Sequence, residues 1–163
     1  MTSEGLSLAG FNRLPAATAE AALLGCCRAP RWARAIAAAR PYVSTRSLLA
    51  AADAASAALD DAEIDEALAG HPRIGDRPAS PASAREQAGV AGDDVRAALA
   101  EGNRAYEAKF GHIYLVCAAG RSGEELLAVL RARLDNDPST ERQVMRTELA
   151  KINRLRLAGL VVA

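Results

Sequence analysis

The chain has 163 residues, with 20 basic and 20 acidic side chains and a formal net charge of zero. Because no run of like charges occurs, the composition argues against nucleic acid or an anionic lipid surface as a partner. Charges interrupt the apolar stretches well before the roughly 18 residues that a membrane span needs, and no basic segment followed by an apolar one opens the chain. We therefore expect one soluble domain over residues 1–163, without a secretory signal.

The three cysteines indicate reduced thiols. Cys26 and Cys27 are adjacent, so a disulfide between them would be strained, and Cys117 lies in an apolar run. This usage fits a cytoplasmic protein. The sequence contains neither the Cys/His spacing of a zinc site nor a glycine-rich nucleotide-binding pattern, and so gives no support for such a cofactor.

Alanine-rich segments with apolar residues at helical spacing dominate the chain, and alternating β-branched residues are almost absent. This pattern predicts an all-α fold, a bundle of about eight helices. In chain order, the expected helices span residues 16–26, 30–40, 44–59, 61–69, 81–89, 93–109, 122–135 and 138–160. Thr18 and Ser44 are candidate N-caps, and Pro30 and Pro81 suit the first position of a helix.

The longest irregular stretch, residues 70–80, contains the sequence HPRIGD at residues 71–76. Pro72 pushes His71 out of the helical region, and Gly75 permits a tight turn. An imidazole held in this way suits acid/base chemistry at neutral pH. The structural alternative is a histidine that ends a helix and interacts with the terminal carbonyl groups.

A second candidate is the triplet Ser83, Glu86 and Gln87. Its spacing of i, i+3 and i+4 would place a hydroxyl, a carboxylate and an amide on one helix face. Ser-x-x-Glu is also the capping-box pattern, in which the two side chains satisfy backbone N–H groups at a helix start. A cap would explain Ser83 and Glu86 but leaves Gln87 unexplained, so both interpretations stay open.

A third candidate is Arg121, just before a helix that we expect to start near Gly123 with Ser122 as N-cap and Glu125 as its reciprocal partner. Exposed N–H groups and a guanidinium fork together suit a carboxylate or another planar anion. The alternative is a surface arginine in a connection. The preceding apolar residues 113–119 fit either a buried helical turn or an extended segment, and periodicity does not decide between them.

Other prominent side chains are not expected to take part in chemistry. His112 has no acid/base partner nearby in the sequence, so we expect it at the surface or in packing. We expect Tyr106, Phe110 and Tyr114 in the core. The apolar face of a long C-terminal helix is predicted to consist of Leu149, Ile152, Leu155, Leu157 and Leu160.

Three sequences occur in order: HPRIG at residues 71–75, SAREQAG at 83–89 and KFGHIYLVCAAGRS at 109–122. Together they resemble the 2-oxo-4-hydroxy-4-carboxy-5-ureidoimidazoline (OHCU) decarboxylase family of uric acid degradation. LLGCCRAPRWARAIAAARPY at 23–42 and RLDNDPSTERQVMRTELAKINRLRL at 133–157 extend the resemblance over nearly the whole chain.

The resemblance implies a compact all-helical fold, a homodimer, and no metal or organic cofactor. It implies three catalytic residues: His71 as acid/base, Glu86 to hold or polarise that imidazole and the ureido group, and Arg121 to pair with the anionic substrate. The residues implied to bind the substrate, some through backbone groups along the ring edge, are Pro72, Ser83, Gln87, Leu115, Val116, Cys117, Ala118 and Ala119.

The reaction implied is cofactor-independent decarboxylation of OHCU to (S)-allantoin. The substrate brings its own electron sink, because an imine carbon adjoins the carboxylated carbon. The protein must then orient the carboxylate, stabilise an enol-like anion and deliver a proton to one face. Two other functions stay open on the residues alone: a helical interaction module, and a cofactor-free hydrolase or isomerase of a hydantoin-like ring.

Overall fold

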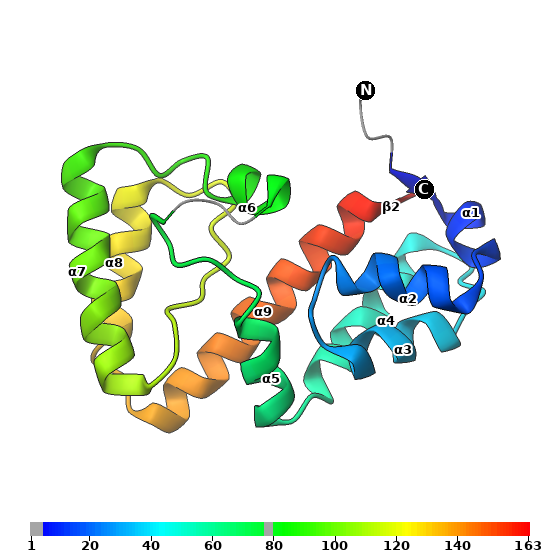
Figure 1. Cartoon of the computed structure of the whole chain (residues 1–163), viewed down its shortest axis with the longest axis horizontal. Coiled ribbons are helices and arrows are strands. Elements are labelled where there is room, and N and C mark those ends of the chain that lie inside the picture. Colours follow the sequence, from blue (N-terminus) through cyan, green and yellow to red (C-terminus); the bar gives the residue numbers. More distant parts are fainter. Residues whose placement is uncertain (1–4, 77–79) are drawn as a thin grey trace. The chain divides into compact units, whose positions relative to one another are not determined.

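The computed structural model describes residues 5–76 and 80–163, which form nine α-helices and two short strands (Figure 1). This architecture confirms the expected all-α class. The described residues divide into two compact units, unit 1 with residues 5–67 and 150–163 and unit 2 with residues 68–149. No helix in these described ranges is both long and apolar enough to cross a membrane.

Unit 1 contains the N-terminal helices, the later part of the last helix and both strands. Its elements are β1 (Leu6–Ser7), α1 (Leu8–Arg13), α2 (Ala16–Leu24), α3 (Pro30–Ala38), α4 (Thr45–Ala57), α5 (Asp61–Leu68), which ends at the unit boundary, and β2 (Val161–Val162). Helix α2 packs against α3, and α3 packs against α4, with apolar side chains between them. The largest of these is Trp32, which is fully buried and donates its indole N–H to the Ala52 carbonyl oxygen over 3.3 Å.

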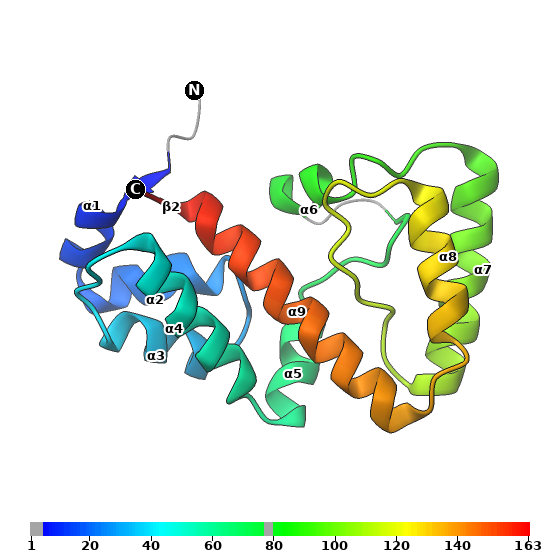
Figure 2. The ribbon, with the colours of Figure 1, turned by 180° about the vertical axis from the view of Figure 1, so that it is seen from behind.

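Unit 2 contains the remaining helices, α6 (Pro81–Glu86), α7 (Asp93–Phe110), α8 (Gly123–Arg133) and the first part of α9 (Pro138–Leu160). Helices α7 and α8 lie side by side in both views (Figures 1 and 2). Their buried faces share one apolar cluster with the irregular segments of the unit. Its buried members are Ile74, Val90, Leu99, Tyr106, Tyr114, Val116, Ala118, Leu126 and Leu130.

Most predicted helix starts are confirmed. Ser44 and Ser47 form a capping box at the start of α4, and Pro30 and Pro81 occupy the first turns of α3 and α6. The predicted cap at Thr18 is wrong, because α2 begins directly after a proline and Thr18 already lies inside the helix.

The sequence patterns missed α1 and the strand pair. Ser7 caps α1, its hydroxyl accepting a hydrogen bond from the Gly10 N–H over 3.0 Å. Strands β1 and β2 pair in parallel, with Leu6 opposite Val161, but two residues are too few for an alternating pattern.

The predicted apolar face of α9 is confirmed in part. Leu149, Ile152 and Leu157 are buried, and Leu160 is half-buried. Leu155 is 44% exposed, which makes its expected place on the buried face wrong.

Candidate functional site

All of the site residues predicted from the sequence lie in unit 2. They come from three places: the chain after α5, helix α6 with the residues that follow it, and the segment between α7 and α8. Residues 77–79, which belong to the expected irregular stretch, lie outside the described residues.

The first place is a turn fastened to α7. The Asp76 N–H donates to the Arg73 carbonyl oxygen over 3.1 Å, and Gly75 has a φ of 91°, a left-handed conformation that glycine adopts without strain. From α7, the Asn103 side chain donates to the Ile74 carbonyl oxygen over 3.0 Å. Arg73 is also paired with an α7 carboxylate, that of Glu107, at 2.9 Å. The turn therefore has a fixed conformation.

His71 and Pro72 are half-buried at the start of this turn. The His71 backbone N–H donates to the Leu68 carbonyl oxygen over 3.0 Å, closing the last turn after α5. His71 therefore follows directly on the end of the helix, as its sequence context predicts. The catalytic role of His71 stays a prediction.

The second place is α6, where the capping-box interpretation of Ser83 and Glu86 is wrong. The cap is Ser80, whose hydroxyl oxygen accepts the Ser83 backbone N–H over 3.1 Å, so Ser83 lies within the first turn and is only 2% exposed. The sequence offered two serines three residues apart, and the upstream one precedes Pro81 directly. With the cap assigned elsewhere, the buried hydroxyl of Ser83 and the half-buried carboxylate of Glu86 keep their i, i+3 relation on α6.

Gln87 joins the second place to the first. Its Oε1 accepts the Gly75 backbone N–H over 3.0 Å. Because a backbone N–H can only donate, this bond fixes which end of the amide faces the turn, and the Nε2 donors face the other way.

Beside this contact lies a cavity of about 410 Å³, with Gly75, Gln87 and Arg96 in its lining. Of the predicted site residues, all of which are described, its lining includes Gln87 alone. The cavity therefore does not by itself mark the site.

The third place adjoins the second through a backbone contact that only glycine permits. A Cβ atom added to Gly89 would lie 2.1 Å from the Arg121 carbonyl oxygen. The Gly123 N–H donates to the Gly89 carbonyl oxygen over 3.2 Å. In both ribbon views the segment leading into α8 passes beside α6 (Figures 1 and 2). The three motifs are thus linked within one unit, from the 71–76 turn through Gln87 to Gly89 and Arg121.

Residues 113–118 form neither helix nor strand, which resolves the open choice in favour of an extended segment. Leu115, Val116 and Ala118 are buried, whereas Cys117 is half-buried and Ala119 is exposed.

The segment ends in a reverse turn. The Arg121 N–H donates to the Ala118 carbonyl oxygen over 3.0 Å, and Gly120 has a φ of 76°. Ser122 then caps α8, as predicted, by accepting the Glu125 N–H over 3.1 Å.

The charge of Arg121 affects a buried side chain of unit 2, that of Tyr114. Burial raises the pKa of Tyr114, and the charges of Arg133 and Arg121 oppose this rise. The Tyr114 hydroxyl donates to the Leu126 carbonyl oxygen over 2.9 Å, so Tyr114 is a structural residue. The half-buried Arg121 therefore brings positive charge close to Tyr114 in the extended segment, and its role in anion binding stays a prediction.

The aromatic residues pack as expected. The ring of His112 lies 5.5 Å from that of Tyr106 and 6.2 Å from that of Phe110, measured between centroids. Tyr106 and Tyr114 are buried core residues.

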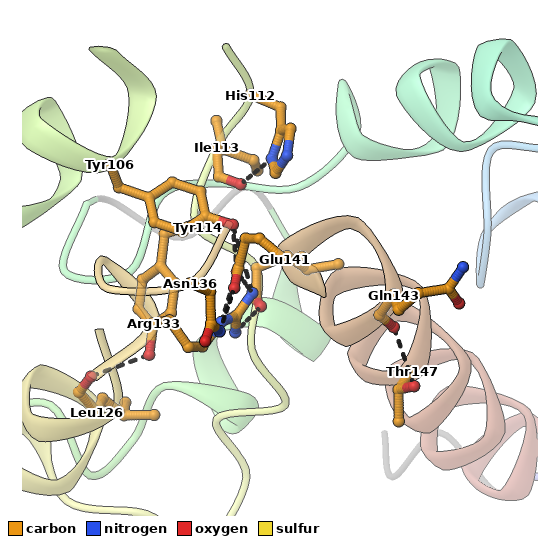
Figure 3. A network of polar contacts seen from close by, with 11 residues as sticks. Tyr106, His112, Ile113, Tyr114, Leu126, Arg133, Asn136, Glu141, Gln143 and Thr147 are labelled. Atoms are coloured by element: carbon orange, nitrogen blue, oxygen red, sulfur yellow. Dashed lines mark hydrogen bonds and ion pairs between the residues drawn. The ribbon is translucent and has the colours of Figure 1, made fainter. Parts of the chain in front are cut away.

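A buried polar network behind the extended segment was not identified in the sequence. Arg133 donates to Glu141 and to the Leu115 carbonyl oxygen, and the Tyr106 hydroxyl donates to Glu141 (Figure 3). Burial opposes the charge of Arg133, but the hydrogen bond and charge of Glu141 leave its pKa raised. Tyr106, Arg133 and Glu141 come from α7, α8 and α9, and Leu115 from the extended segment, so no periodicity within one helix reveals the network.

No group of three or more His, Cys, Asp or Glu side chains in the described ranges is arranged to hold a metal ion. Among the described residues, Cys26, Cys27 and Cys117 are not joined in a disulfide. Cys26 and Cys27 are buried, and burial raises the pKa of each to about 11.

Solved structures share this fold. A crystal structure of OHCU decarboxylase in the presence of (S)-allantoin matches with a TM-score of 0.74 and 28% identity, covering 84% of this chain and 94% of that one. The crystal structure of (S)-allantoin synthase matches with a TM-score of 0.76, covering 96% of this chain and 54% of that one. The identity of the second is 18%, so it bears on the fold alone. The molecule thus shares its fold with nearly all of the first structure and with about half of the second.

Two curated relatives agree. The uric acid degradation bifunctional protein TTL of Arabidopsis thaliana is 32% identical over 146 residues, which are 83% of this chain and 45% of that protein. The 2-oxo-4-hydroxy-4-carboxy-5-ureidoimidazoline decarboxylase of Amia calva is 39% identical over 59 residues, 36% of this chain and 34% of that protein. The matches span less than half the length of each of these curated relatives.

The family model for OHCU decarboxylase matches residues 12–158. This chain belongs to the OHCU decarboxylase family. The resemblance read from the three motifs is confirmed.

Proposed function

We propose that this chain converts OHCU to (S)-allantoin by decarboxylation without a cofactor. The observation that carries the proposal is the link between the three motifs. Gln87 accepts a hydrogen bond from Gly75, and Gly89 lies against the backbone of Arg121. Family membership over residues 12–158 supports the same reaction.

The chemistry needs few protein groups. The carbon–carbon bond to the carboxylate breaks, carbon dioxide leaves, and the electron pair moves onto the adjacent imine nitrogen, which takes a proton. The resulting enol then loses its O–H proton while the ureido-bearing carbon gains one. The protein contributes orientation, charge stabilisation and a proton donor on one face.

His71 is proposed as the acid/base for the second step. It lies at the start of a turn whose later residues are bonded to α7 and to Gln87, so its backbone is held in place. Glu86, the residue before Gln87, is proposed to orient the imidazole and the ureido group. A single donor fixed on one side of the ring would account for formation of one enantiomer.

Arg121 is proposed to bind the substrate anion. Its guanidinium extends from a reverse turn at the end of the extended segment. Backbone groups across residues 115–119 would hydrogen-bond to the edge of the ring, and Pro72, Ser83 and Gln87 would complete the pocket.

The test is to follow freshly generated product of urate oxidation by circular dichroism, with the protein and with heat-denatured protein. We expect rapid appearance of (S)-allantoin together with carbon dioxide release. A rate equal to the spontaneous one would contradict the proposal. Turnover of the ring without carbon dioxide release would instead indicate a hydrolase or isomerase.

Substitution of two arginines tests where the substrate binds. Arg121→Ala should raise KM by about 10–100-fold, since charge-assisted hydrogen bonds are lost. Arg96→Ala is the matched control, because Arg96 lines the 410 Å³ cavity, whose lining does not include Arg121, and should leave KM unchanged. The opposite result would place the substrate in that cavity.

We further propose that the protein acts as a homodimer in the cytoplasm. Three cysteines outside any disulfide, Cys26, Cys27 and Cys117, suit a reducing compartment. Light scattering coupled to size-exclusion chromatography measures the oligomeric state. A monomer with full activity would contradict the dimer.

A further inference from the structure

The buried network of unit 2 is built around one ion pair, Arg133 with Glu141 (Figure 3). Arg133 is 5% exposed and Glu141 is 0% exposed. The Arg133 Nε donates to Glu141 Oε1 over 2.6 Å, and the Tyr106 hydroxyl donates to the same oxygen. Asn136 donates to Glu141 Oε2 over 3.0 Å, so both carboxylate oxygens accept hydrogen bonds.

This ion pair also holds the backbone of the extended segment. Arg133 Nη1 donates to the Leu115 carbonyl oxygen over 2.7 Å. Because residues 113–118 are in neither helix nor strand, that carbonyl is not bonded through regular secondary structure. A buried carbonyl needs a hydrogen-bond partner, and Arg133 supplies it.

We propose that Arg133, oriented by Glu141, is a positioning residue that sets the extended segment and Arg121 for substrate binding. The inference rests on the proposed function. Leu115 is the first residue of the segment proposed to contact the ring. Three residues on, the Ala118 carbonyl oxygen accepts the Arg121 N–H, so displacement of Leu115 passes to Arg121 through a short stretch of chain.

A buried pair of Arg133 with Glu141 suits a positioning role better than a role in stabilising the fold. Replacing a buried ion pair by apolar residues of similar volume is often neutral or stabilising, so a charged pair is a weak stability device. A guanidinium, however, is planar and presents donors in a fixed fork. Arg133 uses that geometry to hold Glu141 and Leu115 at once.

The test replaces the network with apolar residues of similar size, as Tyr106→Phe, Arg133→Met and Glu141→Leu together. This variant leaves no buried charge or hydroxyl of the network unpaired, but it removes the donor to Leu115. We expect cooperative unfolding and a helical circular dichroism spectrum. We also expect kcat/KM for OHCU to fall by about 10–100-fold, mainly through KM, as misplaced binding groups predict.

A structural control distinguishes misplacement from loss of folded protein. Met145→Ala, one turn after Glu141 on α9, removes a fully buried side chain of the same unit that is not a member of the apolar cluster shared with the extended segment. Lost folded protein lowers the apparent kcat and leaves KM unchanged, which is the result expected for Met145→Ala. A triple variant with wild-type KM and kcat would overturn the proposal.

A second variant covers the case in which the triple variant does not fold. Arg133→Lys keeps the charge opposite Glu141 but lacks the fork that reaches Leu115 as well. We expect it to fold and to show the same rise in KM. A wild-type KM in this variant also overturns the proposal.

Amide hydrogen exchange separates this proposal from the proposed function. Exchange at residues 116–121 should become faster in either folded variant, while exchange in α7 stays slow. If the wild-type protein does not decarboxylate OHCU, the proposed function fails, and unchanged exchange at residues 116–121 would still refute the positioning.

Discussion

Unit 1 and unit 2 use different interactions to fix their backbones. In unit 1, helices α2, α3 and α4 follow one another with short connections and pack apolar faces together. Its buried polar side chains among the described residues are neutral, Ser56 and Asn153, with 3.2 Å between the serine hydroxyl and the asparagine amide. Unit 2 buries charged side chains, Arg133, Glu141 and Glu148, and holds long irregular segments.

The difference reflects where backbone groups find partners. Helices satisfy their own N–H and C=O groups, so helix packing needs only apolar contact. The irregular segments of unit 2 need side-chain donors and acceptors, supplied by Asn103 to Ile74, Gln87 to Gly75 and Arg133 to Leu115. Irregular backbone can present polar groups to a substrate, which explains why the predicted site lies in this unit.

The largest effect should come from the turn of unit 2. His71→Asn removes the proposed proton donor and should lower decarboxylation by about 10²–10⁴-fold, with the fold intact. Stereospecific allantoin formation by circular dichroism is the measurement. Near-wild-type turnover would exclude His71 as the acid/base and break the assignment of chemistry to unit 2.

A substitution in the helix packing of unit 1 should lower stability and leave catalysis by the folded protein unchanged. Leu48→Ala deletes a fully buried side chain of α4 and should lower the free energy of unfolding by about 2–5 kcal/mol. Urea denaturation measures this change. The KM of the remaining folded protein should equal that of the wild type. A raised KM would show that helix packing in unit 1 also affects substrate binding.

Gly89→Ala tests the backbone contact between the second and third motifs of unit 2. The added Cβ would meet the Arg121 carbonyl oxygen at 2.1 Å, so the backbone must move, at a cost of about 1–3 kcal/mol. We expect KM to rise several-fold because Arg121 shifts. A destabilised variant with unchanged KM would show that Arg121 does not depend on this contact.

The reactivity of the cysteines should differ between the two units. Cys26 and Cys27 in unit 1 are buried, with pKa values raised from 9.0 to about 11, whereas Cys117 in unit 2 is half-buried. At pH 8 iodoacetamide should modify Cys117 first, and (S)-allantoin should slow that reaction, as read by mass spectrometry. Equal rates at the three thiols would contradict the difference in burial between the units, and no protection by (S)-allantoin would contradict the placement of the substrate.

The same shifts predict a pH dependence. Folding raises the pKa of Cys26 and Cys27, so the neutral thiols contribute stability below pH 9.0, and this contribution is lost as pH rises through about 11. Urea denaturation from pH 8 to 11 should show a steeper loss for the wild type than for the Cys26→Ala, Cys27→Ala variant.

The smallest effect should come from Gly159→Ala near the end of α9 in unit 1. An added Cβ there meets no atom within 4 Å, so only helix propensity changes. We expect a gain of up to about 0.5–1 kcal/mol in the free energy of unfolding. A loss of stability would indicate that this surface is covered in solution.

The sequence predicts the helices of both units well, since alanine-rich periodicity and local caps act over a few residues. The expected 138–160 and the observed α9 coincide, and α7 extends one residue beyond its expected end. The local pattern pointed to the wrong serine at the start of α6, where Ser80 and not Ser83 is the cap.

Periodicity and local caps do not predict the network around Arg133. Glu141 lies eight residues away across a helix break, and Leu115 belongs to a segment without periodicity. Pairing of this kind depends on tertiary packing, so sequence patterns reached the three motifs but not the residue that holds one of them in place.

Helix α9 has a consequence for the order in which the chain is made. It supplies residues 138–149 to unit 2 and residues 150–160 to unit 1. Domains commonly fold from the N-terminal end during synthesis. Here the ribosome releases all of unit 2 before the segment that completes unit 1, and β1 acquires its partner only when Val161 and Val162 emerge. The first unit to be translated is therefore the last to be finished.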